Sequence, residues 1–119
     1  MDNEYIWILR ILPALPGVIF IVTGYITLKF PPKSVNWWYG YRTTNSMRSQ
    51  EIWEYAQHYS SVEFMRLGGI QAILGILVGF TVANEIFPVA YLLVSCIACA
   101  IAGFIRTESE LRNKFPEAH

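Results

Sequence analysis

Charged residues are scarce in this chain. Its 119 residues include 9 Lys or Arg and 9 Asp or Glu, so that 15% of them carry a charge. A chain of this length normally forms one domain, and a soluble domain has about 25% charged residues to cover its surface. The shortage of charge therefore argues against a soluble protein.

A surplus of positive charge is lacking as well. The formal net charge at pH 7 is zero. Proteins that bind nucleic acid need an excess of Lys and Arg, because these residues replace the counterions around the phosphates. We therefore expect no nucleic-acid partner.

Cysteine and histidine are rare, with two of each. No metal-ligand spacing, phosphate loop or nucleophile elbow is present, so we predict no metal, no cofactor and no enzymatic activity. Cys96 and Cys99 have the spacing of thiol-disulfide enzymes, but they lie inside an apolar run where a thiolate is costly. We interpret them as packing residues. Glu51, Glu54 and His58 share a helical face, which a solvated or interfacial helix explains better than a metal site does.

Three long apolar runs account for the composition. They cover residues 11–28, 67–83 and 86–105. As helices, each would span about 26 to 30 Å, which matches a hydrocarbon core of about 30 Å. The rival interpretation, buried helices of a soluble bundle, is disfavoured by the length of the uncharged runs. The sequence thus predicts an all-α, integral membrane three-helix bundle that forms a single domain over residues 1–119.

The first apolar run contains Pro13, Pro16 and Gly17. These residues predict either a kink in a longer helix or a helix that begins near Pro13. The segment before the run is acidic and lacks the positive start of a signal peptide, so we expect this span to remain in the mature protein.

Positive charge is divided unevenly between the two ends of the predicted spans. Residues 29–66 and the tail after residue 105 contain eight Lys or Arg, whereas the N-terminal segment contains only Arg10. The positive-inside rule then places the N-terminus outside and both the long loop and the C-terminus in the cytoplasm. We expect a multi-pass membrane protein.

Aromatic residues gather in the long connection between the first two spans. Of the chain's 18 Phe, Trp and Tyr residues, 8 lie between residues 30 and 59. Such residues favour the headgroup region, so the connection is expected to lie at the membrane interface. Helical spacing returns near Ser49, which predicts an interfacial amphipathic helix within residues 29–66, capped by Ser46 or Ser49 and bent at Gly68-Gly69 before span two.

Small residues form stripes on the second and third spans. Such stripes let helices pack closely. The partner helix can belong to the same chain or to a second copy; we favour packing within the bundle and keep a homo-oligomer as the alternative. The candidate packing residues are Gly75, Gly79, Ser95, Cys99 and Gly103. Gln71, a polar residue in span two, either bonds across helices or lies near the interface.

A motif of spaced residues occupies the long connection and the start of the following helix. It consists of Asn36, Gly40, Arg42, Thr43, Ser46, Trp53 and Ala56. Gly40 can supply a backbone conformation that is closed to other residues, and Asn36, Thr43 and Ser46 can satisfy backbone groups of the loop. Arg42 offers a planar fork of donors for the ends of the spans or for lipid phosphates. A structural lock and a binding role are equally open explanations of the motif.

This motif, between two membrane spans, resembles that of the SdpI family of bacterial membrane immunity proteins. The family often has proline after its Arg-Thr pair, where this chain has Thr44. The resemblance implies a place in the bacterial plasma membrane and protection against a secreted, membrane-active peptide toxin. It also implies a role seen in some relatives, which look like receptors that hold a transcription regulator at the membrane. The expected partners are therefore the lipid bilayer, a peptide toxin and a cytosolic regulator. An alternative hypothesis is a small non-enzymatic subunit of a membrane transport or assembly complex.

Overall fold

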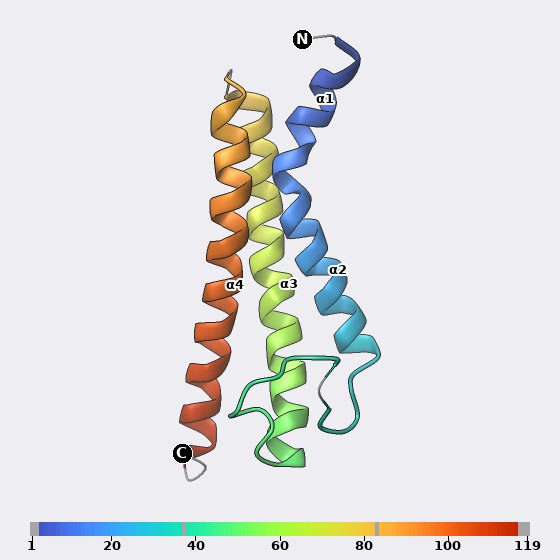
Figure 1. Ribbon diagram of the computed structural model, residues 1–119, viewed down its shortest axis with the longest axis vertical. Helices are drawn as coiled ribbons and strands as arrows, with labels where there is room; N and C mark the ends of the chain where they lie inside the picture. Colours follow the sequence, from blue (N-terminus) through green and yellow to red (C-terminus); the bar gives the residue numbers. More distant parts are fainter. Residues whose placement is uncertain (1–2, 37, 83, 117–119) are drawn as a thin grey trace.

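The computed structural model describes residues 3–36, 38–82 and 84–116, and these residues form helices and loops without a strand (Figure 1). The helices are α1 (Asn3–Ile11), a short 3-10 turn η1 (Leu12–Ala14), α2 (Leu15–Lys29), α3 (Gln50–Thr81) and α4 (Ile86–Lys114). The predicted all-α class is confirmed. Trp37 of the aromatic cluster and Ala83 at the end of the second apolar run lie outside the described residues.

Three helical segments are long and apolar enough to cross a membrane. They are Ile6–Lys29, Gln50–Thr81 and Ile86–Lys114. Large apolar side chains on their outer faces stay exposed. For example, 66% of the surface of Ile73 and 67% of that of Val94 is accessible. Apolar patches of this extent are unusual on a soluble monomer but suit a surface that faces lipid. The chain is thus a membrane protein built as a helical bundle.

The first span is kinked at its prolines. The turn η1 contains Pro13 and separates α1 from α2, with the backbone N–H of Leu15 bonded to the carbonyl of Leu12. Proline has no N–H to donate and interrupts the regular ladder, which explains the change of helical geometry at this point. Because α1 is already helical from Asn3, the kink is the alternative that the structure adopts.

α3 is one continuous helix of 32 residues, so the helix predicted at the end of residues 29–66 is its first part and runs into span two with no helix end at Gly68-Gly69. The predicted cap at Ser49 is confirmed, because its hydroxyl accepts a hydrogen bond from the Ile52 N–H at 3.2 Å. Gly68 permits close packing instead of a bend. A Cβ atom on Gly68 would lie 2.6 Å from the carbonyl oxygen of Gly17, so α2 could not approach a larger residue here.

Different segments of the chain lie at the two ends of the bundle. The long loop and the C-terminal end of α4 lie at one end, whereas the N-terminus and the α3–α4 turn lie at the other (Figure 1). This arrangement agrees with three crossings. The longest dimension is 56 Å, which exceeds a hydrocarbon core of about 30 Å. Part of the molecule therefore extends beyond the core, and at the loop end Ile52, Ala56 and Leu111 form a small buried cluster.

Candidate functional site

Trp53 joins the start of α3 to the end of the first span. Its side chain is fully buried, and its indole Nε1 donates a hydrogen bond to the carbonyl of Pro32 at 2.7 Å. Pro31 and Pro32 follow the last turn of α2 and cannot continue a helical ladder. Trp53 therefore fixes the point at which the chain leaves the first span and enters the loop.

Asn36 closes the first turn of the loop. Its side-chain oxygen accepts hydrogen bonds from the backbone N–H groups of Trp38 and Tyr39, at 3.0 and 2.8 Å, and its amide donates to the carbonyl of Ser34. A short amide side chain can replace a backbone partner in this way. The hydroxyl of Tyr39 reaches back to the carbonyl of Phe30 at 2.7 Å, so the turn is also tied to the end of α2.

Gly40 occupies a backbone conformation that favours glycine. Its φ angle is 101°. A Cβ atom at this position would lie 2.5 Å from Oε1 of Gln57 and 2.6 Å from Cγ of Pro32. Both the backbone angle and the lack of space therefore require glycine here.

The side chain of Gln57 forms hydrogen bonds with both backbone groups of Tyr41 in the loop. Its Oε1 accepts from the N–H of Tyr41 and its Nε2 donates to the carbonyl of Tyr41, each at 2.7 Å. The side chain is 2% exposed, so both of its polar groups and both backbone groups of one loop residue are satisfied together. Gln57 was not among the predicted site residues. Its position one turn after Trp53 on the same face was the available signal.

Thr43 and Ser46 bond to each other reciprocally. The N–H of Thr43 donates to Oγ of Ser46 at 2.8 Å, and the N–H of Ser46 donates to Oγ1 of Thr43 at 3.1 Å. Ser46 is fully buried and also donates to carbonyls of the same turn. Ser46 thus closes the loop, while Ser49 caps α3.

Glu108 of α4 receives three donors from the loop. Its Oε2 accepts from the hydroxyls of Tyr41 at 2.6 Å and Thr43 at 2.8 Å, and its Oε1 accepts from Nδ2 of Asn45 at 2.7 Å. Burial, together with the hydrogen bond and the charge of Glu108, raises the pKa of Tyr41, so that this phenol stays a donor at neutral pH. The motif loop is therefore attached to α4 through one carboxylate that is 7% exposed.

The sequence analysis did not assign Glu108 to the site. Glu108 follows the third apolar run, where the tail was considered only for its positive charge. An acidic residue in a segment that also holds Arg106, Arg112 and Lys114 was the signal that could have found it. Contacts between residues so far apart in the chain leave no periodic pattern.

Arg42 differs from the rest of the motif. Asn36, Gly40 and Thr43 are partly buried and Ser46, Trp53 and Ala56 are buried, but the side chain of Arg42 is exposed. Among residues 3–36, 38–82 and 84–116, no side chain or carbonyl accepts a hydrogen bond from Arg42. Of the two partners predicted for Arg42, the ends of the spans thus receive no hydrogen bond from it, and lipid phosphate stays a prediction. The motif holds itself together and presents Arg42 outward.

The predicted packing residues lie between the helices of this chain. Cβ atoms on Gly75 and Gly79 would meet the backbone of the first span, and one on Gly103 would meet the ring of Phe64. Ser95 accepts a hydrogen bond from Gln71 at 2.9 Å, and Cys99 Sγ lies 3.9 Å from the carbonyl of Leu67.

Gln71 bonds across helices, which is one of its two predicted roles. Its Oε1 accepts from the N–H of Gly17 at 2.7 Å, and its Nε2 donates to the carbonyl of Pro13 at 2.8 Å. These bonds supply partners for backbone groups that the kink leaves outside the regular ladder. Cys96 and Cys99 are both free thiols. In the described part of the chain, no three His, Cys, Asp or Glu side chains gather as a metal site would require.

These features define a small membrane protein with three helical spans and a loop that is locked onto two of them. A profile of the SdpI/YfhL protein family matches residues 33–107. A protein of Bacillus subtilis (strain 168), described as uncharacterized protein YfhL, is 35% identical over 96 residues, which cover 81% of this chain and 82% of that protein. The chain belongs to the SdpI/YfhL family. No solved structure matches it.

Proposed function

We propose that this protein protects a bacterium against a secreted, membrane-active peptide toxin. Membership of the SdpI/YfhL family supports the proposal, because the motif of the chain resembles that of membrane immunity proteins. The observation that carries it is the exposure of Arg42 in a motif whose other residues are buried or partly buried. A motif that only held the fold together would not need to present a guanidinium to the surroundings.

In this proposal, the toxin contacts the end of the molecule that lies away from the motif loop. A cavity of about 360 Å³ lies between the first span, the end of α3 and the start of α4, at the end away from the loop. Apolar residues such as Ile6, Leu9 and Leu92 form most of its lining, together with Arg10 and Glu85. In the proposed orientation this end faces outward, so the spans and their cavity meet the toxin in the outer half of the bilayer.

Arg42 would serve a partner on the cytoplasmic side. A guanidinium held on a rigid loop can bind a carboxylate or phosphate through two parallel hydrogen bonds. An acidic surface on a cytosolic regulator is the partner that this chemistry fits best. Protection, in this proposal, requires both toxin contact at the spans and partner contact at Arg42.

The direct test uses cells that lack this gene and any related gene. Such cells, with and without a plasmid copy, are challenged with purified hydrophobic peptides secreted by competing strains, and survival is counted. We expect survival to depend on the plasmid copy for at least one membrane-permeabilising peptide. Equal survival at matched growth rate, with the protein detected in the membrane fraction, would reject the immunity proposal. Labelling of single cysteines placed in the loop and in the α3–α4 turn tests the orientation.

A second candidate is a small subunit of a larger membrane complex. Only 6% of the residues in the most apolar stretch of α4 are buried, compared with 22% in the corresponding stretch of each of the other two spans. This open face suits a helix of another protein as well as it suits lipid. Purification in mild detergent separates the candidates, because a subunit keeps a partner in stoichiometric amount and a protein that acts alone does not.

A further inference from the structure

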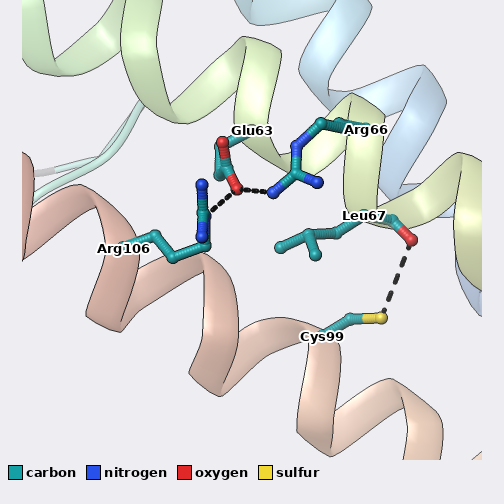
Figure 2. A network of polar contacts seen from close by, with 5 residues as sticks. All are labelled: Glu63, Arg66, Leu67, Cys99 and Arg106. Carbon is teal, nitrogen blue, oxygen red and sulfur yellow. Dashed lines mark hydrogen bonds and ion pairs between the residues drawn. The ribbon is translucent and has the colours of Figure 1, made fainter.

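Two arginines from different helices share one carboxylate oxygen. Arg66 of α3 and Arg106 of α4 both form ion pairs with Oε1 of Glu63 (Figure 2). The side chain of Glu63 is 8% exposed, whereas those of Arg66 and Arg106 are 48% and 53% exposed. The carboxylate is therefore inside the bundle, and the two guanidiniums extend from it toward the surroundings.

This cluster retains positive charge and free donors. Two guanidiniums and one carboxylate give a net charge of about +1, because arginine stays protonated in proteins. Arg66 uses one Nη2 contact and Arg106 uses one Nε contact. Each guanidinium has five N–H donors. Within the described residues, the remaining donors of both arginines have no hydrogen-bond partner.

We infer the depth of the cluster in a bilayer from helix lengths. A hydrocarbon core of about 30 Å corresponds to about 20 residues of helix. Counting back from the end of α3 at Thr81 and forward from the start of α4 at Ile86 leads to about residues 61 and 106. Both counts start at the α3–α4 turn and place Glu63 and Arg106 within about two residues of the end of the core, with Arg66 about one turn further in, from where its long side chain can reach the phosphates. Exposed apolar side chains of Ile70 and Ile105 lie on the adjoining helical turns and face the acyl chains.

We propose that Arg66 and Arg106 bind the phosphate of an anionic phospholipid. Guanidiniums match the geometry of a phosphate through parallel hydrogen bonds, and a site of net positive charge favours a headgroup of net negative charge over a zwitterionic one. Glu63 acts as the positioning residue, because one of its oxygens holds two long side chains from two helices close to each other. The bound lipid would bridge α3 and α4 at the cytoplasmic interface. This inference does not depend on the immunity proposal.

Binding can be measured on the purified full-length protein in mild detergent. Phosphatidylglycerol, phosphatidylcholine and inorganic phosphate are added separately, and bound lipid is counted by native mass spectrometry alongside the thermal unfolding temperature. We expect phosphatidylglycerol to remain bound and to raise the unfolding temperature, while phosphatidylcholine and inorganic phosphate do neither. Equal stabilisation by inorganic phosphate would overturn the lipid assignment, and equal retention of phosphatidylcholine would overturn the preference for an anionic headgroup.

The matched variants remove the same number of charges from the same end of the protein. Arg66→Gln/Arg106→Gln should lower phosphatidylglycerol occupancy at least fivefold. Lys33→Gln/Arg112→Gln, which removes two exposed charges of the loop and tail, should leave occupancy within twofold of the wild type. A similar loss in both double variants would mean general charge attraction and would overturn the site. Circular dichroism confirms that each variant is folded before binding is compared.

Glu63→Gln separates positioning from simple charge. This substitution raises the local charge to about +2, and attraction by charge alone would then strengthen binding of an anionic lipid. Loss of the shared carboxylate instead frees the two arginines, so we expect occupancy to fall at least threefold. Stronger binding by Glu63→Gln would overturn the positioning role. Arg66→Lys/Arg106→Lys keeps both charges without the planar fork and should give an intermediate loss.

Discussion

The hydroxyl of Tyr41 in the loop donates a hydrogen bond of 2.6 Å to Glu108 of α4, a residue 67 positions further along the chain. Thr43 and Asn45 add two more donors to the same carboxylate. One side chain near the end of α4 thereby holds a loop that begins at the end of α2. Because the loop also rests on Gln57 of α3, it connects all three spans at one end of the bundle.

Replacement of Glu108 by glutamine should loosen this attachment. The amide keeps the shape of the carboxylate but loses its charge and one acceptor oxygen, and hydrogen bonds to charged groups contribute about 1.5 to 3 kcal/mol. We expect Glu108→Gln to lower the free energy of unfolding by about 2 kcal/mol and to speed proteolysis within residues 30–49. Thermal unfolding in detergent and limited proteolysis measure both effects. Glu54→Gln, at an exposed position, is the control and should change neither.

The stability that the Tyr41–Glu108 hydrogen bond contributes should decrease at high pH. The pKa of Tyr41 is raised in the folded protein, above a value of about 10 for an unperturbed tyrosine. A group with a raised folded pKa adds stability that is complete below the unfolded pKa and is lost as pH rises toward the folded one. We expect this contribution to be constant from about pH 6 to 9 and to decline above about pH 10. Unfolding temperatures of the wild type and Tyr41→Phe across this range provide the measurement. Parallel curves for the two proteins would contradict the assignment.

Much of the fold could be predicted because membrane spans have a strong signal in composition. The three apolar runs follow from local chemistry and are present. For the cap and for the prolines the sequence left two alternatives each, of which the structure has the Ser49 cap and the kink. The helix predicted before span two is present, and it joins that span without a helix end at Gly68-Gly69 for a physical reason. Amphipathic and apolar patterns can follow each other on one helix without a break, and glycines inside a helix can serve close packing instead of a bend, as Gly68 does against Gly17.

The site was predictable only in part. Asn36, Gly40 and Ser46 satisfy or shape nearby backbone, so their residue types reveal their use. Gln57 and Glu108 act on the loop from distant helices, and no local pattern shows that they would meet it. The exposure of Arg42 also depends on the path of the folded loop. The long-range polar contacts of Gln57 and Glu108 and the direction of the Arg42 side chain therefore could not be predicted from the sequence.

Two glycine substitutions should have different effects on stability. Gly40→Ala places a side chain where φ is 101° and where Gln57 and Pro32 leave no room, so we expect a loss of about 1 to 3 kcal/mol. Gly69→Ala is the matched control, because no atom lies within 4 Å of a Cβ added there. Alanine favours a helix over glycine, so this control should be neutral or should stabilise by up to about 1 kcal/mol. Thermal unfolding of both variants in the same detergent tests the pair, and a larger loss at Gly69 would contradict the observed packing.

Substitutions at Trp53 and Arg42 should distinguish the buried residues of the motif, which stabilise the fold, from the exposed Arg42, which does not. Trp53→Ala removes a fully buried side chain and its bond to Pro32, so we expect a loss of about 3 to 5 kcal/mol and little protein in the membrane. Arg42→Ala removes an exposed side chain, and its unfolding free energy should stay within about 0.5 kcal/mol of the wild type.

Survival under toxin challenge then decides what Arg42 contributes. With Arg42→Ala present at the wild-type level, we expect survival to fall at least tenfold, because the locked loop would no longer present a guanidinium to its partner. Arg42→Lys keeps the charge but not the planar fork, so its survival should lie between those of the wild type and the alanine variant. Full protection by Arg42→Ala at normal abundance would show that the motif serves the fold alone. In that case, the toxin contact proposed at the spans and at the cavity beside Arg10 would have to account for protection without a partner at Arg42.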